Sequence, residues 1–362
     1  MVKLTWENKS NISENIKDLK LRYLDYFEPV NLGVGDFEGN KWKNLLFWGE
    51  NLNVLHYLTN NFSGKIDLIY VDPPFFSGTN YKIEIEDEEN GNQYDSIAYF
   101  DHWNKDIDSY LQMLRDRIVL FRELLSTNGL LFIHLDWHAS HYVRVLLDEI
   151  FGANRFVNSI VWYYYNKYSA GKKNLPRAHD DILVYSKSAN YTFNELRSLR
   201  KKPIKQLKRV MVDGVLKNAK DENGHTIYRV VKDKKIDDVW KIPCMQPASK
   251  EWTGFPTQKH HDLLERIIKL GSNEGDLVAD FFCGSGTTLL AADKLNRRWI
   301  GSDISEYSIY LTRKRLLNYR KKVIDQVKKL EPIEIYTHFD EQKKNLISTG
   351  FFEKDLKIKR KK

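Results

Sequence analysis

Residues 280–288 read DFFCGSGTT and join an apolar run, residues 278–281, to a helical pattern over residues 286–295. Gly284 and Gly286 allow the backbone to turn tightly and to approach a ligand closely. The N-terminus of the following helix offers free N–H groups and the positive end of a dipole to a carboxylate or a phosphate. The next apolar run ends at Asp303, whose carboxylate can accept hydrogen bonds from two ribose hydroxyls. We therefore expect a strand–turn–helix unit that binds a ribose-bearing cofactor.

Two common nucleotide sites do not match this stretch. A P-loop requires a lysine after its second glycine, whereas Gly286 is followed by Thr287. The glycines also do not complete a GxGxxG pattern, which argues against a nicotinamide or flavin dinucleotide. An ordinary tight turn between a strand and a helix is the alternative interpretation of this stretch alone.

A second distinctive stretch, Asp72-Pro73-Pro74-Phe75, follows the apolar run DLIYV at residues 67–71, which predicts a buried strand. The two prolines end the strand and hold the backbone rigid. A carboxylate beside a carbonyl can accept both hydrogens of an amino group, and an aromatic ring can stack on a planar base. A rigid turn with a core phenylalanine is the alternative, but two such signals at strand ends of one chain favour a site.

Strand and helix patterns alternate along most of the chain. Strands are expected at residues 45–48, 67–71, 130–135, 156–164, 182–185, 278–281 and 299–302, and helices at residues 52–58, 110–125, 138–150, 263–270, 286–295 and 307–317. This alternation predicts an α/β fold, a doubly wound and mostly parallel Rossmann-like sheet with helices on both faces. Ligands of such sheets lie beyond the carboxyl ends of the strands, where both stretches fall.

The composition is typical of a large globular protein with a polyanionic partner. The chain has 362 residues, 42% of them hydrophobic, a formal net charge of +8 and a pI near 9.0. This charge suits nucleic acid, although ordinary soluble proteins can also be basic. Cys244 and Cys283 lack the spacing of metal ligands or of a disulfide framework, and the sequence shows no signal peptide or membrane span. A cytoplasmic location is therefore expected.

Together, these stretches resemble the motifs of the amino-methyltransferases of restriction-modification systems. Their tetrapeptide is (Asp/Asn/Ser)-Pro-Pro-(Tyr/Phe/Trp), and their cofactor motif is similar to DPFxGSGTT, with Phe281 here in place of the proline. The catalytic motif precedes the cofactor motif, with a variable region between them, which resembles the permuted β class. Residues 134–136, 148–152 and 179–187 are similar to further stretches of the family, so the resemblance covers most of residues 45–317.

Two shorter stretches also resemble the family. Residues 49–52 are similar to its GDNLxxL stretch, whose acidic residue faces the adenine of the cofactor. Residues 257–259 resemble the TQKP stretch that helps to hold the methionine end, with His260 in place of the usual proline. The resemblance implies S-adenosylmethionine as the cofactor. The residues that it assigns to cofactor binding are Glu50, Asn51, Thr257, Gln258, Lys259, Asp280, Phe281, Phe282, Gly284, Ser285, Gly286, Thr287 and Asp303.

The resemblance also implies a mechanism in which the target base is flipped out of the duplex. The catalytic residues that it assigns are Asp72, Pro73, Pro74 and Phe75. Phe75 would stack on the base, and the Asp72 carboxylate and the Pro73 carbonyl would accept hydrogen bonds from its amino group. The transfer is direct, and the chemistry needs no metal. Aspartate before Pro-Pro favours adenine N6 as the target, with cytosine N4 as the alternative.

The chain is expected to comprise four segments. These are the catalytic half of the core (residues 1–186), a target-recognition insert (187–250), the cofactor-binding half of the core (251–325) and a basic C-terminal extension (326–362). In the insert the hydrophobic periodicity is lost and cations gather, which predicts contacts to the phosphates of double-stranded DNA. The cations proposed for DNA binding are Arg197, Arg200, Lys201, Lys202, Lys205, Lys208 and Arg209.

Aromatic residues of the insert, Tyr191, Tyr228 and Trp240, are expected either to contact bases or to pack a small core. For any single cation there, a solvated surface is the alternative. Residues 76–104 are expected to form a long loop that closes over the flipped base. His260 and His261 are expected to have a surface or capping role rather than to bind a metal.

Partners follow from the resemblance alone. Similar enzymes often form homodimers and often act beside a cognate restriction endonuclease, so both are expected here, and no membrane partner is. Other functions stay open: a non-catalytic nucleic-acid-binding subunit with this fold, or methylation of RNA or of a protein glutamine. A cytosine-C5 methyltransferase would need a thiolate in a Pro-Cys pair. Pro243-Cys244 is such a pair, but it is expected to lie in the irregular insert and to be an ordinary small apolar residue.

Overall fold

The computed structural model describes residues 3–6, 9–10, 22–27, 42–78, 81–87, 93–99, 101, 106–167, 173–323, 330–337 and 356–358. The chain forms two compact units. The larger unit comprises Met1–Phe193 and Val239–Lys362, and the smaller unit comprises Asn194–Asp238.

The larger unit is built on a ten-stranded sheet with the order β1-β16-β2-β15-β14-β3-β6-β8-β7-β13. Neighbouring strands are parallel except at β1 and β8, which run antiparallel to the strands beside them. The predicted doubly wound, mostly parallel α/β fold is confirmed. In sequence order the strands are β1 (Arg22–Phe27), β2 (Asn44–Trp48), β3 (Ile66–Val71), β6 (Leu125–Leu135), β7 (Phe156–Tyr163), β8 (His179–Ser186), β13 (Val239–Lys241), β14 (Leu277–Asp280), β15 (Arg298–Asp303) and β16 (Ile333–Thr337).

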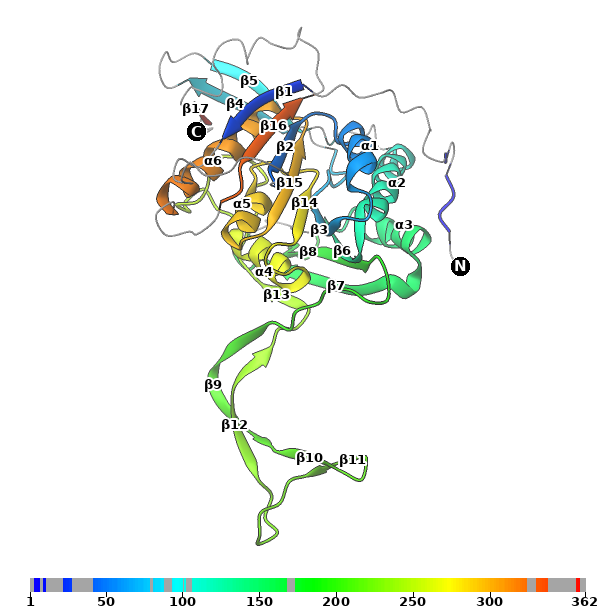
Figure 1. The fold of residues 1–362 in the computed structure, drawn as a ribbon, viewed down its shortest axis with the longest axis vertical. Helices are drawn as coiled ribbons and strands as arrows, with labels where there is room; N and C mark the ends of the chain where they lie inside the picture. The colour runs from blue at the N-terminus through cyan, green and yellow to red at the C-terminus, as the bar shows by residue number, and fades with distance from the viewer. Residues whose placement is uncertain are drawn as a thin grey trace. The chain divides into compact units, whose positions relative to one another are not determined.

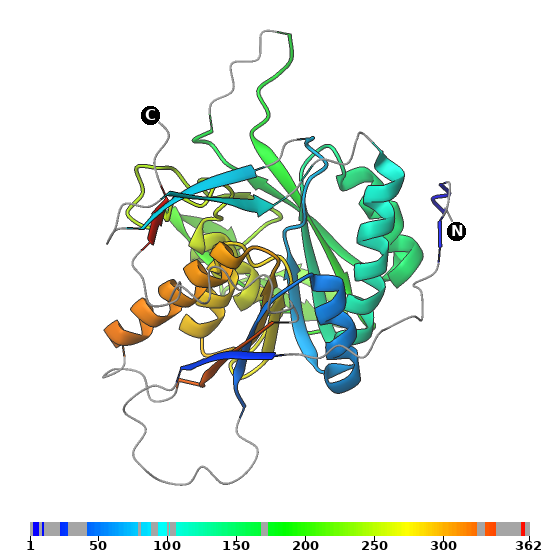
Figure 2. The ribbon, with the colours of Figure 1, turned by 90° about the horizontal axis from the view of Figure 1, so that it is seen from above.

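Helices cover both faces of this sheet (Figure 1 and Figure 2). One face carries α1 (Asn51–Phe62), α2 (Ile107–Leu124) and α3 (Ser140–Phe151), and the other carries α4 (His261–Gly271), α5 (Thr287–Lys294) and α6 (Glu306–Val323). The buried positions of α2, among them Leu114, Ile118 and Phe121, recur every three or four residues and give it one apolar side. Because helices lie on both faces, the central strands are apolar throughout, as in IDLIYV of β3.

Residues 76–104 contain a hairpin, so the prediction of one long loop is wrong. The hairpin pairs β4 (Tyr81–Asp87) with β5 (Gln93–Tyr99), and β17 (Leu356–Ile358) pairs with the other edge of β4. The stretch YKIEIED has the period of two expected of a strand, but its acidic residues favoured a loop interpretation. Residues 79–80, 88–92, 100 and 102–105 lie outside the described residues, and closure over a base stays a prediction.

The smaller unit, Asn194–Asp238, is shorter than the predicted insert of residues 187–250. It contains a long hairpin of β9 (Arg197–Leu207) and β12 (Tyr228–Lys235) and a short hairpin of β10 (Arg209–Val212) and β11 (Val215–Asn218). Its strands are largely exposed, because a two-stranded ribbon has little apolar surface to bury. Residues 239–250 instead belong to the larger unit, where β13 pairs with β7 and Trp240 is 2% exposed. Trp240 therefore packs in the main sheet and does not face DNA.

The sheet also extends into the predicted C-terminal extension. β16 pairs in parallel with β2, and β1 pairs with the far edge of β16. Ile333 and Ile335 are buried, as the alternation in IEIYT requires. The basic residues 359–362 lie outside the described residues. Among the helices that the structure describes, none is both long enough and apolar enough to cross a membrane.

Candidate active site

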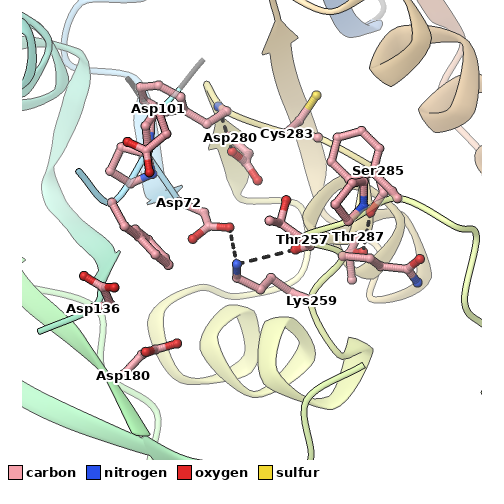
Figure 3. A pocket seen from close by; sticks show the side chains of 18 of the residues that line it. Asp72, Asp101, Asp136, Asp180, Thr257, Lys259, Asp280, Cys283, Ser285 and Thr287 are labelled. Carbon is pink, nitrogen blue, oxygen red and sulfur yellow. Dashed lines mark hydrogen bonds and ion pairs between the residues drawn. The ribbon is translucent and has the colours of Figure 1, made fainter. Parts of the chain in front are cut away.

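A cavity of about 770 Å³ lies at the carboxyl ends of β3, β14 and β15. Every predicted catalytic residue lines it, and so does every predicted cofactor residue except Gly286. Figure 3 shows the Asp72 carboxylate and the Asp280 carboxylate on neighbouring walls of this cavity. The two stretches that the sequence singled out therefore share one site.

The glycine-rich turn between β14 and α5 is held by its neighbours. Gly284 and Gly286 have φ angles of 51° and 74°, in the left-handed region that disfavours side chains. The N–H group of Gly284 donates a 2.8 Å hydrogen bond to Oδ2 of Asp303, which ties the turn to the end of β15. A Cβ on Gly286 would lie 2.5 Å from Oγ1 of Thr312. Gly286 therefore serves close packing against α6 rather than contact with a ligand.

The buried carboxylate of Asp280 and the half-buried carboxylate of Asp303 face the cavity from the ends of β14 and β15. Burial raises the pKa of Asp280 to about 7 and the pKa of Asp303 to about 6. Backbone N–H groups donate to both side chains but do not reverse these shifts. A ligand with hydroxyl groups would give these carboxylates the further donors that buried acceptors require. With Phe255 and Phe282 on the apolar walls, the lining fits the ribose and the planar base of the expected cofactor.

Glu50 and Asn51, at the start of α1, form another wall of the cavity. Oε2 of Glu50 accepts a hydrogen bond from the N–H group of Asn53, which caps the helix, and its other oxygen forms an ion pair with Arg117 of α2. Nδ2 of Asn51 donates to the carbonyl of Phe281 at 2.9 Å, and its Oδ1 accepts from Nε of Arg117 at 2.6 Å. Arg117 thus holds both predicted cofactor residues in place.

The tetrapeptide turn leaves β3 with its backbone fixed at two points. The Tyr110 hydroxyl of α2 donates a 2.8 Å hydrogen bond to the Pro74 carbonyl. Phe76, directly after the tetrapeptide, has a φ of 64°, which is rare for a bulky residue. The N–H groups of Phe76 and Ser77 donate to the two carboxylate oxygens of buried Asp101, each at 2.8 Å. Asp101 therefore stabilises the strained backbone beside the catalytic residues.

Asp72 lies between two cationic side chains. Its Oδ2 is 2.6 Å from Nζ of Lys259 (Figure 3), and its Oδ1 is 2.9 Å from Nδ1 of His134. Burial alone would raise the pKa of Asp72, but Lys259 and His134 together hold the pKa below its ordinary value. The ammonium group of Lys259 also lies 5.3 Å from the centre of the Phe75 ring. Asp72 is therefore ionised at neutral pH.

The loop before α4 presents Thr257 and Lys259 to the cavity. Gln258, which is buried, organises this loop: its Oε1 accepts from the N–H and hydroxyl groups of Thr253, and its Nε2 donates to the carbonyl of Glu251. The sequence assigned Lys259 to the cofactor, and the structure places its ammonium group on the catalytic carboxylate.

The sequence analysis assigned no role in the site to four buried or half-buried residues that hold it: Asp101, Arg117, His134 and Asp180, of which His134 and Asp180 lie in stretches that resemble the family. His134 left a signal, because it is the one polar residue in the apolar stretch LLFIHL at residues 130–135. Asp101 and Arg117 left none, since their partners are brought to them only by the tertiary fold.

The predicted DNA-binding cations belong to the smaller unit. The register of β9 against β12 is irregular between Leu199 and Ile204, so strict alternation does not fix the faces of the cations in this stretch. Arg197 pairs with Asp233 at 3.0 Å and with Glu195 at 2.6 Å. Lys208 and Arg209 lie where β9 passes into β10. At least one of the seven cations, Arg197, is thus paired with acidic residues of its own unit.

Cys244 follows β13 and lines the cavity, so its expected place in an irregular insert is wrong, because β13 belongs to the main sheet. Its thiol lies 3.3 Å from Oδ1 of Asn166.

His260 is the N-cap of α4, as its predicted capping role requires, and its Nδ1 accepts a 3.2 Å hydrogen bond from the N–H group of Asp262. His260, His261 and Asp262 have potential metal-ligand atoms within 4.8 Å of one another. The helix cap already uses Nδ1 of His260.

The parallel sheet, the glycine-rich turn and the tetrapeptide turn around one cavity define an α/β enzyme with a nucleoside-type ligand beside a second substrate. Residues 66–314 match the DNA methylase family, and the chain belongs to that family. It is 28% identical over 337 residues to the type II methyltransferase M.EcaI of Enterobacter cloacae, covering 78% of this chain and 72% of the relative. It is 29% identical over 269 residues to the type II methyltransferase M.HpaI of Haemophilus parainfluenzae, covering 73% and 72%. It is also 28% identical over 277 residues to the DNA adenine methyltransferase YhdJ of Escherichia coli K12, covering 73% and 82%.

Proposed function

We propose that this DNA methylase transfers a methyl group from S-adenosylmethionine to adenine N6 of a base flipped out of double-stranded DNA. The observation that carries the proposal is the shared cavity, in which the Asp72 tetrapeptide lies beside the carboxylates of Asp280 and Asp303. The bound cofactor would supply an electrophilic methyl group. Asp303 and Asp280 would accept hydrogen bonds from its hydroxyl groups, and Glu50 would face its adenine.

The chain's own residues bind and orient the base. Asp72 is ionised and lines the cavity, where its carboxylate can accept from an amino group. Phe75 offers an aromatic ring beside it for stacking. Holding the amino nitrogen in line with the methyl group converts an encounter into an intramolecular step, which supplies much of the acceleration. The half-buried Asp72 carboxylate also stabilises the positive charge that develops on the nitrogen.

Adenine is favoured over cytosine by the aspartate before Pro-Pro and by the name of one relative. YhdJ is described as a DNA adenine methyltransferase. Cytosine N4 remains the alternative target, because its amino group presents the same two hydrogens to Asp72. A cytosine-C5 mechanism would require the Cys244 thiolate, so we expect Cys244→Ala to retain activity. Loss of activity in a folded Cys244→Ala protein would support the thiolate mechanism instead.

The smaller unit is proposed to contact DNA phosphates through its exposed lysines. A cognate restriction endonuclease, a homodimer and a cytoplasmic location also belong to this proposal. Light scattering of the purified protein tests the dimer, since a monomeric mass at micromolar concentration contradicts it.

The substrate class can be tested by methyl transfer from tritiated S-adenosylmethionine. Label should enter duplex DNA, and much less should enter an RNA of the same sequence or a glutamine-containing peptide. Asp72→Ala should bind the cofactor in calorimetry yet transfer no label, which tests base binding separately from cofactor binding. Label in RNA or peptide, but not in DNA, would overturn the proposal, and cofactor binding without transfer would support a non-catalytic subunit.

A further inference from the structure

His134 of β6 is fully buried with its ring between two carboxylates. Its Nδ1 lies 2.9 Å from Oδ1 of Asp72, and its Nε2 lies 3.3 Å from Oδ2 of Asp180 on the neighbouring strand β8. The Tyr164 hydroxyl donates a 3.1 Å hydrogen bond to the other oxygen of Asp180. This chain of contacts runs from the catalytic carboxylate into the protein interior.

Aromatic rings fix the orientation of the His134 imidazole. The Phe75 ring meets it edge to face, with centroids 5.2 Å apart, and the Trp162 ring does so at 5.3 Å. Phe75 belongs to the tetrapeptide, so His134 contacts both the carboxylate and the aromatic residue proposed to bind the base. A buried histidine in such a place has a role beyond filling space.

We propose that His134, held by Asp180, is a positioning residue that orients the Asp72 carboxylate and keeps it ionised while the amino group of the base is methylated. The inference rests on the proposed function, because it concerns the same site.

The charges around the imidazole favour its protonated form. Burial alone lowers the pKa of His134, but Asp72 and Asp180 raise it by more, so that it lies above the ordinary value of 6.5. Lys259 lowers the pKa of His134. The neutral hydroxyl of Tyr70 lies 3.4 Å from Nδ1 of the same ring. Burial raises the pKa of Asp180 while His134, Lys259 and Tyr164 lower it, leaving the pKa below its ordinary value. Both shifts favour an imidazolium between two carboxylates.

This ion pair holds the inner oxygen of the carboxylate. Oδ1 of Asp72 is buried, and Nδ1 of His134 lies 2.9 Å from it. His134 thus holds the carboxylate from the protein interior, while the Asp72 side chain still lines the cavity. Lys259 performs the corresponding role at Oδ2 from the other half of the chain.

The first test does not require turnover. In protein labelled at histidine Cε1, the NMR signal of His134 is assigned by its loss in His134→Gln and then followed from pH 5 to pH 9. We expect its midpoint above that of an ordinary histidine, and a lower midpoint in Asp180→Asn. A midpoint at or below the ordinary value would overturn the inference, even if the protein methylates DNA as proposed.

The second test measures kinetics. His134→Gln and Asp180→Asn should lower kcat by about tenfold or more and leave KM for cofactor and DNA within about twofold. The acidic limb of the kcat profile should move to higher pH, which a merely structural role would not cause. His261→Gln is the matched control, since His261 also pairs with a carboxylate, Glu251 at 2.6 Å, but does not line the cavity.

Folding of each variant is checked by thermal unfolding and by cofactor affinity. If His134→Gln does not fold, Asp180→Asn decides the question, because it keeps the shape of the side chain and leaves His134 in place. A folded variant with unchanged kcat and an unchanged acidic limb would contradict the inference. If the wild type itself transfers no methyl group to DNA, the proposed function fails, and the NMR titration still decides the state of His134.

Discussion

The ammonium nitrogen of Lys259 lies 2.6 Å from Oδ2 of Asp72, so a residue from the predicted cofactor-binding half contacts the predicted catalytic carboxylate. The contact joins the loop before α4 to the turn after β3. Lys259 also lies near the Phe75 ring and the carbonyl of Thr257. It therefore links the two motifs that the sequence identified separately.

Replacing Lys259 should make the enzyme more sensitive to acid. Burial raises the pKa of Asp72 and Lys259 lowers it, so Lys259→Gln should raise the pKa of the carboxyl group. Because the ionised form accepts from the base, the acidic limb of kcat at saturating cofactor should move to higher pH. The pH profile from 5 to 9 measures this, with Lys269→Gln on the outer side of α4 as control. An unmoved limb would show that Lys259 does not govern Asp72.

Gly286→Ala should weaken cofactor binding as well as stability. Its Cβ would lie 2.5 Å from Oγ1 of Thr312, and its φ of 74° adds backbone strain. We expect a loss of roughly 2 kcal/mol or more in the free energy of unfolding and a higher cofactor Kd by calorimetry. Gly64→Ala is the matched control, because Gly64 has a φ of 69° but nothing within 4 Å of the added Cβ. Equal effects of the two substitutions would refute the role given to close packing on α6.

Asp280 should make the unliganded protein less stable as pH rises. Burial raises its folded-state pKa to about 7 from an ordinary value of 3.8, so its contribution to stability is full below pH 4 and is lost as pH rises through 7. The loss amounts to up to about 4 kcal/mol. Asp280→Asn should remove this loss. Urea unfolding at pH 5 and pH 8 measures it, and parallel pH dependences for wild type and variant would contradict the shifted pKa.

The exposed lysines of β9 should contribute to DNA affinity through phosphate contacts. Lys201→Gln with Lys202→Gln should raise the Kd for duplex DNA about equally for all sequences. It should also reduce the slope of log Kd against log salt by about one unit per lysine. Lys321→Gln with Lys322→Gln, two exposed lysines of α6, is the control with the same change in charge. An unchanged slope would remove β9 from the DNA interface.

The sequence predicted the central sheet well because its strands are buried on both faces and its helices have a clear apolar period. IDLIYV of β3 and the apolar positions of α2 are examples. The hairpin of β4 and β5, the edge strand β1 and its neighbour β16 were missed. Their short alternating or acidic stretches resemble loops, and pairing partners far along the chain decide whether they form strands.

The motif residues of the candidate site were predicted from the sequence. Two residues that support them, Asp101 and Arg117, could not be predicted. Asp72 and Asp280 lie in stretches whose residue types and place after strands indicate chemistry. Asp101 and Arg117 act through contacts with residues that only the fold brings close. The predicted end of the insert at residue 250 was wrong for the same reason, since β13 is recognisable only by its pairing with β7.

The most direct test of the account is the identity of the methylated nucleoside. Unmethylated duplex DNA is incubated with the protein and S-adenosylmethionine, digested to nucleosides and analysed by mass spectrometry, beside a parallel reaction with Asp72→Ala. The account predicts N6-methyladenine with the wild-type protein and none with the variant. N4-methylcytosine would keep the site and change the base, whereas 5-methylcytosine, or N6-methyladenine that persists in Asp72→Ala, would contradict the role given to Asp72.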